Sequence, residues 1–273
     1  MADKKREGSI FDDEEFKPYK QRWDTRVKEL NRRAGYYDGS VYNKTMEMLG
    51  WFGNMIPGVK GSIRPLYLPL SRAVDVDAGI IPGDWTFHED TPDDIRDARR
   101  QVFAWSNWST DGVLYTHYAA QYGLTGLRVA DLRPQKRVIV QPVDPTTFML
   151  VDSGAYDATP KMAISVETQV DEQGKKFEYA EVITPEAIRT FKDGKEYGYD
   201  GRQPEETNEM KFVPFVEAQF MRTGNALGEA TYNKAIPLLD EVNSHATYLS
   251  TVIAKHTEPQ WIVFGAEPSQ LNH

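Results

Sequence analysis

The sequence predicts an α+β fold, and three observations lead to it. Apolar residues recur at helical spacing near the N-terminus, short β-type runs separated by turn residues fill the middle of the chain, and a long helical segment follows them. At 273 residues, with 40% hydrophobic and 27% charged residues, the chain has an ordinary globular composition. Its length allows one large domain or two modest ones.

Four helices are expected before the β-rich region. The first begins near Tyr19 and should end at Gly35, because the apolar residues at positions 23, 27, 30 and 34 share one face and glycine commonly ends a helix. A capping hydroxyl at Thr91, a following proline and two acids mark the start of a helix that should run to about Trp105. The other two are expected at residues 41–52 and 113–122.

After Gly126 the pattern changes to short runs rich in β-branched and aromatic residues. Turn residues at 171–174 and 193–194 indicate hairpins, and 201–208 has the composition of a polar loop. The strands are expected at residues 127–132, 137–143, 148–151, 162–170, 176–183 and 212–220.

The longest helical segment is expected from Glu229 to His256. Pro237 lacks a backbone donor and should kink this helix or mark its effective start. Five apolar residues step by 3, 4, 3 and 4 along it, which is the spacing of a coiled-coil seam. We expect this predicted seam to bury against neighbouring helices, within the subunit or in another copy, and not against DNA. It consists of Leu239, Val242, Ala246, Leu249 and Ile253.

The sequence contains no complete catalytic, cofactor or metal site. It has no cysteine, and its five histidines form no pair at the i, i+4 spacing of a zinc hydrolase. Asp75 and Asp77 resemble half of a calcium loop, but Gly79 and Thr86 stand where further oxygen ligands are needed, so a capped turn is the better interpretation. Residues 224–228 lack the Lys-Ser/Thr of a nucleotide loop. We therefore predict a protein that is not an enzyme and that uses no cofactor or metal.

A net charge of −9 and a pI near 5.2 leave no general basic field, so any contact with nucleic acid should be local or weak. The first residues lack the apolar stretch of a secretory signal, and no apolar run reaches the roughly 18 residues of a membrane span. Together with the absence of cysteine, these features favour a protein without a membrane segment that assembles in a reducing cytoplasm. Residues 1–18 are expected to form a polar, mobile segment.

The order of these features resembles the N-terminal part of tailed-bacteriophage portal proteins. The likeness begins with the helix that carries Trp23, Arg26 and Leu30 and leads into the turn at 36–39. The next stretches follow the order of the family's wing region, and the last ones are the most specific. They are Arg64-Pro65-Leu66, 73–78, Tyr118–Gly123, Val140–Pro145, and then 213–217, Gly228, 236–243 and 259–265.

The resemblance implies a wing domain at residues 19–228, a long stem helix at 229–258 and the start of a clip-like region at 259–273. Portals normally continue beyond that point, so the chain is interpreted as a truncated product. The implied function is a structural subunit of a ring, typically dodecameric, at the capsid vertex of the virion. Double-stranded DNA passes non-specifically through such a ring during packaging and ejection.

The partners implied by the resemblance are other copies of the chain, the major capsid and scaffolding proteins, the large terminase subunit and a head-tail adaptor. Two alternatives remain. One is another virion structural protein, such as a head-tail adaptor or a capsid-associated protein. The other is an unrecognised enzyme or nucleotide-binding protein.

Overall fold

The computed structural model of the protein describes residues 8–41, 69–80, 88–132, 135–152, 159–198 and 203–257. The fold is α+β, as predicted. The helix expected at 41–52 lies outside the described residues after Val41, as does the clip-like region expected at 259–273. The helices are α1 (Lys20–Asp38), α3 (Pro69–Ile80), α4 (Asp93–Trp105), α5 (Trp108–Tyr122) and α6 (Ile236–Thr257), with the 3-10 helices η1 (Ile10–Asp12), η2 (Lys17–Tyr19) and η4 (Asn233–Ala235).

The strands form two antiparallel sheets. The smaller sheet has the order β2-β1-β9, and the larger has the order β3-β4-β5-β6-β7, with β8 paired to β6. The strands are β1 (Leu124–Leu132), β2 (Arg137–Val143), β3 (Phe148–Asp152), β4 (Pro160–Val170), β5 (Lys176–Ile183), β6 (Ala187–Lys192), β7 (Lys195–Glu196), β8 (Glu205–Thr207) and β9 (Phe215–Gln219).

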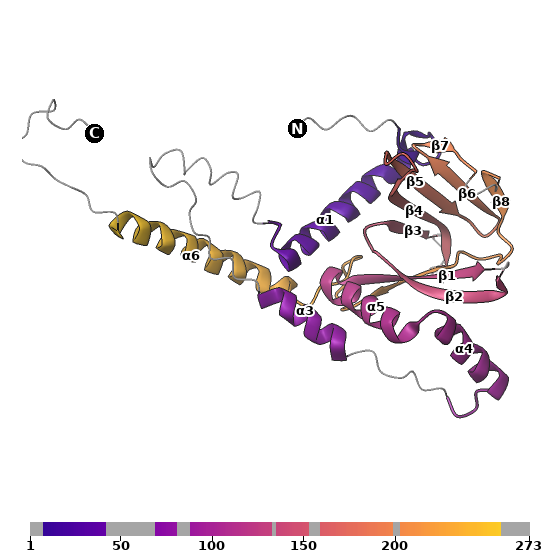
Figure 1. The fold of residues 1–273 in the computed structure, drawn as a ribbon, viewed down its shortest axis with the longest axis horizontal. Helices are drawn as coiled ribbons and strands as arrows, with labels where there is room; N and C mark the ends of the chain where they lie inside the picture. Colours follow the sequence, from indigo (N-terminus) through magenta and orange to yellow (C-terminus); the bar gives the residue numbers. More distant parts are fainter. Residues whose placement is uncertain are drawn as a thin grey trace, which may run out of the picture.

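The elements stack in layers, as Figure 1 shows. The N-terminal segment and α1 cover one face of the larger sheet, the smaller sheet packs on the other face, and α4 and α5 lie against the smaller sheet. Strand β3 contributes side chains to the clusters on both faces of the larger sheet, because consecutive side chains of a strand point to opposite sides. Met149 and Val151 join the cluster beneath α1, whereas Phe148 and Leu150 pack toward β9. Helix α6 extends away from this layered body.

The N-terminal segment corrects one expectation. Residues 8–18 are not a mobile tail, because Ile10, Phe11 and Phe16 are buried against the larger sheet. The carboxylate of Glu178 on β5 anchors the segment: its Oε1 accepts hydrogen bonds from Ser9 Oγ at 2.9 Å and from the Ile10 backbone N–H at 3.0 Å. These three apolar side chains lie in an otherwise polar stretch. They cover the part of the sheet face that α1 does not reach.

We predict that Ile10→Val lowers the free energy of unfolding by about 0.5–1.5 kcal/mol, because it removes one methylene from a fully buried position. Urea denaturation of both proteins measures the difference. The same substitution at Ile95, which is 54% exposed on α4, is the control and should change the free energy by less than about 0.5 kcal/mol. Equal effects at the two positions would mean that the segment is not part of the core.

Several element ends differ from the expected ones. Helix α1 continues through Gly35 and ends at Gly39, whose φ of 79° is the left-handed conformation that glycine adopts most readily. Pro92 is the N-cap of α4, so the hydroxyl of Thr91 does not cap this helix. Asp75–Gly79 lies inside α3 and is not a capped turn. Helix α5 begins at Trp108, five residues earlier than expected.

Candidate assembly site: helix α6 and its junction with the body

Polar residues of the described part do not gather into a metal cluster of three or more histidine and carboxylate side chains. Two of the acids considered for calcium serve instead as acceptors within the fold. Asp75 Oδ1 accepts a hydrogen bond from Tyr37 Oη at 3.1 Å, and Asp77 Oδ2 accepts one from Thr231 Oγ1 at 2.6 Å. These bonds tie α3 to α1 and to the segment before α6. The more informative site is therefore α6 and the junction from which it leaves the body.

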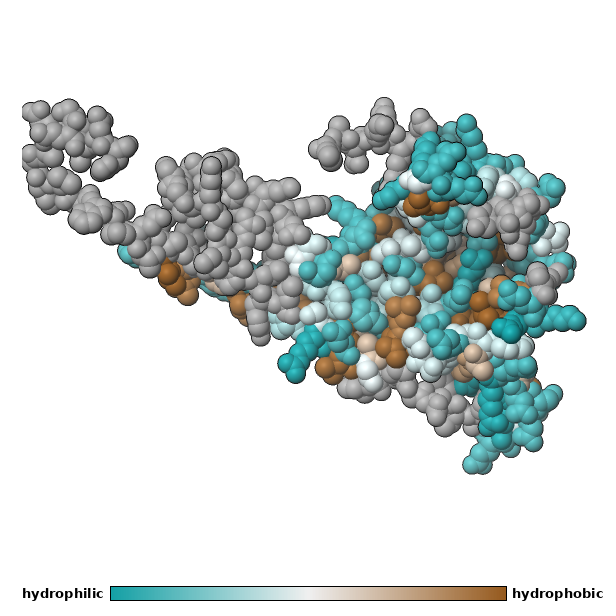
Figure 2. All heavy atoms as spheres, in the orientation of Figure 1, coloured by the Kyte–Doolittle hydropathy of each residue, from teal (hydrophilic) through white to brown (hydrophobic). Residues whose placement is uncertain are grey.

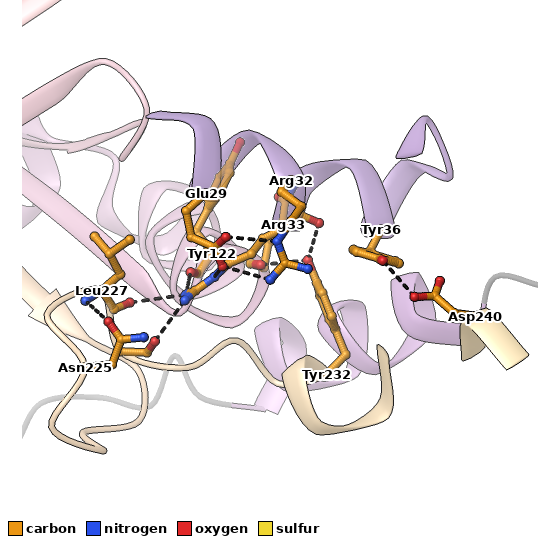
Figure 3. A network of polar contacts seen from close by, with 11 residues as sticks. Glu29, Arg32, Arg33, Tyr36, Tyr122, Asn225, Leu227, Tyr232 and Asp240 are labelled. Carbon is orange, nitrogen blue, oxygen red and sulfur yellow. Dashed lines mark hydrogen bonds and ion pairs between the residues drawn. The ribbon is translucent and has the colours of Figure 1, made fainter. Parts of the chain in front are cut away.

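The first turns of α6 pack on the body. Ile236 and Leu239 are buried in one cluster with Tyr36 of α1 and Val74 of α3. Tyr36 Oη also donates a hydrogen bond to Asp240 Oδ2 at 3.0 Å (Figure 3). The helix begins at Ile236, seven residues after the expected start at Glu229, which agrees with the alternative that Pro237 marks its effective start.

The predicted seam along α6 is buried only at its first position within the subunit. Leu239 is 4% exposed, whereas Leu249 is 61% and Ile253 is 53% exposed. Val242 is also exposed and Ala246 is half-buried. Figure 2 shows brown, hydrophobic side chains along α6 where it extends from the body. Packing of this seam against another copy therefore stays a prediction, since the described part of its own subunit covers little of it.

The C-terminal end of α5 is the anchor of the junction. The last carbonyls of a helix have no partner within the helix and need donors from elsewhere. Here donors from α1, from the segment between β9 and α6 and from Gly123 lie within hydrogen-bond distance of five consecutive carbonyls. The pairs are the Gly123 N–H with Ala119, the Thr231 N–H with Ala120, Tyr232 Oη with Gln121, Arg33 Nη1 with Tyr122, and the Phe220 N–H with Gly123. The single proton of the Tyr232 hydroxyl is shared between the carbonyls of Gln121 and Arg33.

Arg33 of α1 is the central residue of the junction, and its side chain is only 1% exposed (Figure 3). Its guanidinium donates to the carbonyls of Tyr122, Leu227 and Gly228, the last at 3.2 Å from Nη2. Its Nε donates to Glu29 Oε1 at 3.2 Å. A cation at a helix C-terminus is also favoured by the helix dipole. One side chain thus joins α1, α5 and the loop that leads to α6.

Two glycines allow the loop to cross α5 closely. Gly123 has φ +77° and Gly228 has φ +59°, and a Cβ on Gly228 would collide with the carbonyl oxygen of Gly123. The sequence identifies both glycines as element boundaries, but it does not show that they touch.

A second arginine on α1 is also buried. Arg26 pairs with Glu217 of β9, with Nη2 and Oε2 2.7 Å apart, and its guanidinium lies over the ring of Phe148 at 5.3 Å. Burial lowers the pKa of Arg26, and the charge of Glu217 opposes this shift. The fully buried positions of α1 include 23, 26, 30 and 33, whereas the expected positions 27 and 34 are half-buried, with Val27 packed against the core. The sequence does contain a sign that both arginines belong to the buried face, because they lie three or four residues from Trp23 or Leu30.

Because two tyrosine phenols of the junction are buried, we expect the folded protein to lose stability at alkaline pH. Burial raises the pKa of Tyr232 well above its ordinary value, and burial followed by the charge of Asp144 raises the pKa of Tyr122. An unfolded tyrosine ionises near pH 10. The folded protein holds both phenols neutral. The part of the folding stability that depends on these neutral phenols is therefore fully present below about pH 10 and is lost as the pH rises further.

Urea unfolding at about pH 8 and pH 11 tests this prediction. Tyr232→Phe removes one of the two phenols, so its loss of stability between these pH values should be smaller than that of the native protein. Tyr248→Phe is the control, because Tyr248 is exposed on α6 and this change should leave the alkaline loss unchanged. An identical pH dependence of all three proteins would contradict the assignment.

Comparisons with models of known protein families and with curated proteins find no match. Within the described residues, no helix is long and apolar enough to cross a membrane.

Proposed function

We propose that the chain is a structural subunit of a tailed-phage portal ring, the vertex channel through which double-stranded DNA enters and leaves the capsid. One observation supports this function most: α6 extends from the body and carries apolar side chains that the described part of its own subunit leaves exposed. Leu238, Leu249 and Ile253 are each more than half exposed. Contiguous exposed apolar surface commonly marks a protein interface.

A ring supplies the neighbours that α6 lacks within one subunit. Helices in proteins are stabilised mainly by packing of an apolar face, so a helix that stands in water gains little. Fully burying one leucine or isoleucine is worth about 1.5–3 kcal/mol relative to leaving it exposed. In a closed ring every subunit obtains this gain, because the same contact is repeated around the symmetry axis.

In this proposal the layered body is the wing and α6 is the stem helix. The partners are other copies of the chain, capsid and scaffolding proteins, the large terminase subunit and a head-tail adaptor. The net charge of −9 suits a conduit, because walls without excess lysine and arginine form few phosphate contacts and let the duplex slide. The two packed sheets favour a portal over an adaptor with a compact helical core. The subunit has no catalytic role.

Electron microscopy of the purified full chain, combined with mass photometry, tests the proposal. Rings with a central hole are expected, with a mass that is a whole multiple of the 31.1 kDa subunit. Since association depends on concentration, samples should span roughly 1–100 µM. A chain that stays monomeric throughout this range, or that forms only dimers without a hole, would overturn the proposal.

We predict that Leu249→Ala weakens ring assembly and leaves the melting of the isolated subunit nearly unchanged. Leu249 is 61% exposed in the subunit, so its truncation should cost less than about 0.5 kcal/mol there. Burial in a ring contact would make the same truncation cost about 2–5 kcal/mol in the assembly. Sizing and thermal melting of dilute protein measure the two effects separately.

The control is Asp240→Asn, which alters a charge at the root of α6 and leaves the apolar side chains intact. Asp240 accepts a hydrogen bond from Tyr36, so a small loss of subunit stability is expected without loss of assembly. The opposite result, with assembly lost in Asp240→Asn and kept in Leu249→Ala, would place the packing face elsewhere.

A further inference from the structure

The exposed face of α6 has a register of its own. Six residues step by 4, 3, 4, 3 and 4 along the helix, which is the heptad spacing of a coiled coil. They differ by one residue from the predicted seam at three positions, where 238, 245 and 252 replace 239, 246 and 253. We call this set the outer stripe; it consists of Leu238, Val242, His245, Leu249, Val252 and His256.

Every residue of the outer stripe is exposed. The four apolar residues range from 41% at Val242 to 64% at Leu238, and the side chain of His245 is 75% exposed. The side that faces the body carries Ile236, Leu239 and Asn243, which are buried. Helix α6 therefore presents one face to its own body and a second, regular face to the outside.

The charges of the outer stripe favour a second copy of the chain as its occupant. None of the six positions holds lysine, arginine, aspartate or glutamate. The stripe can therefore be buried against a neighbouring copy without burying a charge as long as both histidines are neutral. Protonated histidines would place two positive charges per chain in that contact, where burial of unpaired charge is costly.

This inference rests on the proposed function, since it assumes that the chain assembles with itself. We propose that His245 and His256 make the association of α6 with neighbouring copies dependent on pH: neutral imidazoles allow the contact between copies to form, and protonation opens it. The closed contact then holds fewer protons than the separated chains. Association consequently strengthens as the pH rises and weakens as it falls.

One acid on α6 itself lies near the stripe. Glu241 Oε1 is 3.6 Å from His245 Nε2, and both side chains are largely exposed, so this pair contributes little. The charged groups on the elements that pack on the root of α6 make no ion pair with either histidine among the described residues. They are Glu29, Arg32, Arg33 and Asp38 of α1, Arg72, Asp75 and Asp77 of α3, and Lys234 of η4.

The experiment measures the assembly of the full chain by mass photometry at about pH 5.5 and pH 8, with circular dichroism at both values to confirm folding. The native protein should dissociate at a concentration at least tenfold higher at the lower pH. The double variant His245→Gln, His256→Gln stays neutral throughout and should assemble equally at both. His88→Gln is the matched control: this histidine is 82% exposed and lies outside α6, so its variant should keep the native pH dependence.

The outcomes separate the two proposals. Assembly that is equal at both pH values, or a double variant that keeps the native pH dependence, would overturn the role of the histidines and leave the ring untouched. Absence of assembly at every pH would overturn the ring and, with it, the pH control.

Discussion

Gly123→Ala should lower the free energy of unfolding by more than about 3 kcal/mol. Gly123 has φ +77°, a conformation that is strained for any residue with a Cβ. A Cβ there would also lie 2.5 Å from the carbonyl carbon of Glu229 and 2.6 Å from the backbone nitrogen of Ala230. These neighbours are backbone atoms, so the loop before α6 would have to move away from α5.

Gly174→Ala is the matched control for this experiment. Gly174 lies in the turn between β4 and β5 with the same φ of +77°, but no atom lies within 4 Å of its ideal Cβ position. The backbone strain is thus alike, and the collision occurs only at Gly123. Gly174→Ala should cost about 1–2 kcal/mol in urea denaturation. Equal costs at the two glycines would show that the close crossing at the junction is absent.

Most of the longer strands could be predicted from the sequence, because consecutive side chains of a strand face opposite sides of the sheet and leave a recognisable pattern of residue types. Strands β2 and β5 occupy the expected residues, and β3 and β4 differ from expectation by one or two residues at an end. The sequence does not reveal β6 to β8, which are short and contain Arg189, Lys192 and Glu205 where an apolar pattern would be sought. Their pairing with β5 and with each other depends on tertiary contacts that no local pattern specifies.

The N-terminal segment and α1 show where apolar periodicity fails. Three apolar residues spread over positions 10–16 form no periodic pattern, so nothing local indicates that they complete a sheet face. On α1, Arg26 and Arg33 are buried, although a prediction from the spacing of apolar residues alone would place them in solvent. Buried arginines depend on acceptors brought from elsewhere in the chain, here Glu217 and the carbonyls at the end of α5.

The candidate site on α6 could be predicted as a helix with a seam, but not with its correct register. Apolar residues lie on two faces of α6, one toward the body and one outward, and the sequence alone does not say which face meets which surface. The predicted seam combines Leu239 of the inner face with Leu249 of the outer face. The position of the body, fixed by the junction at Arg33, decides between them.

Arg33→Met should destabilise the protein by about 3–5 kcal/mol, because it leaves two buried carbonyls and the half-buried one of Leu227 without this donor. Methionine keeps much of the length and apolar volume of the arginine side chain, so the change mainly removes the hydrogen bonds and the charge. Urea denaturation monitored by tryptophan fluorescence measures the loss. Arg33→Lys should recover only part of it, since one ammonium group cannot reproduce the planar fork that reaches several acceptors.

The neighbouring arginine provides the comparison that makes this prediction specific. Arg32 lies on the same turn of α1 and also pairs with Glu29, but its side chain is 44% exposed and its contacts are on the surface. Arg32→Met should therefore cost less than about 1 kcal/mol, in line with exposed ion pairs. If the two variants lost the same stability, the carbonyls at the end of α5 would not depend on Arg33. The root of α6 would then be held chiefly by the apolar cluster around Tyr36 and Leu239.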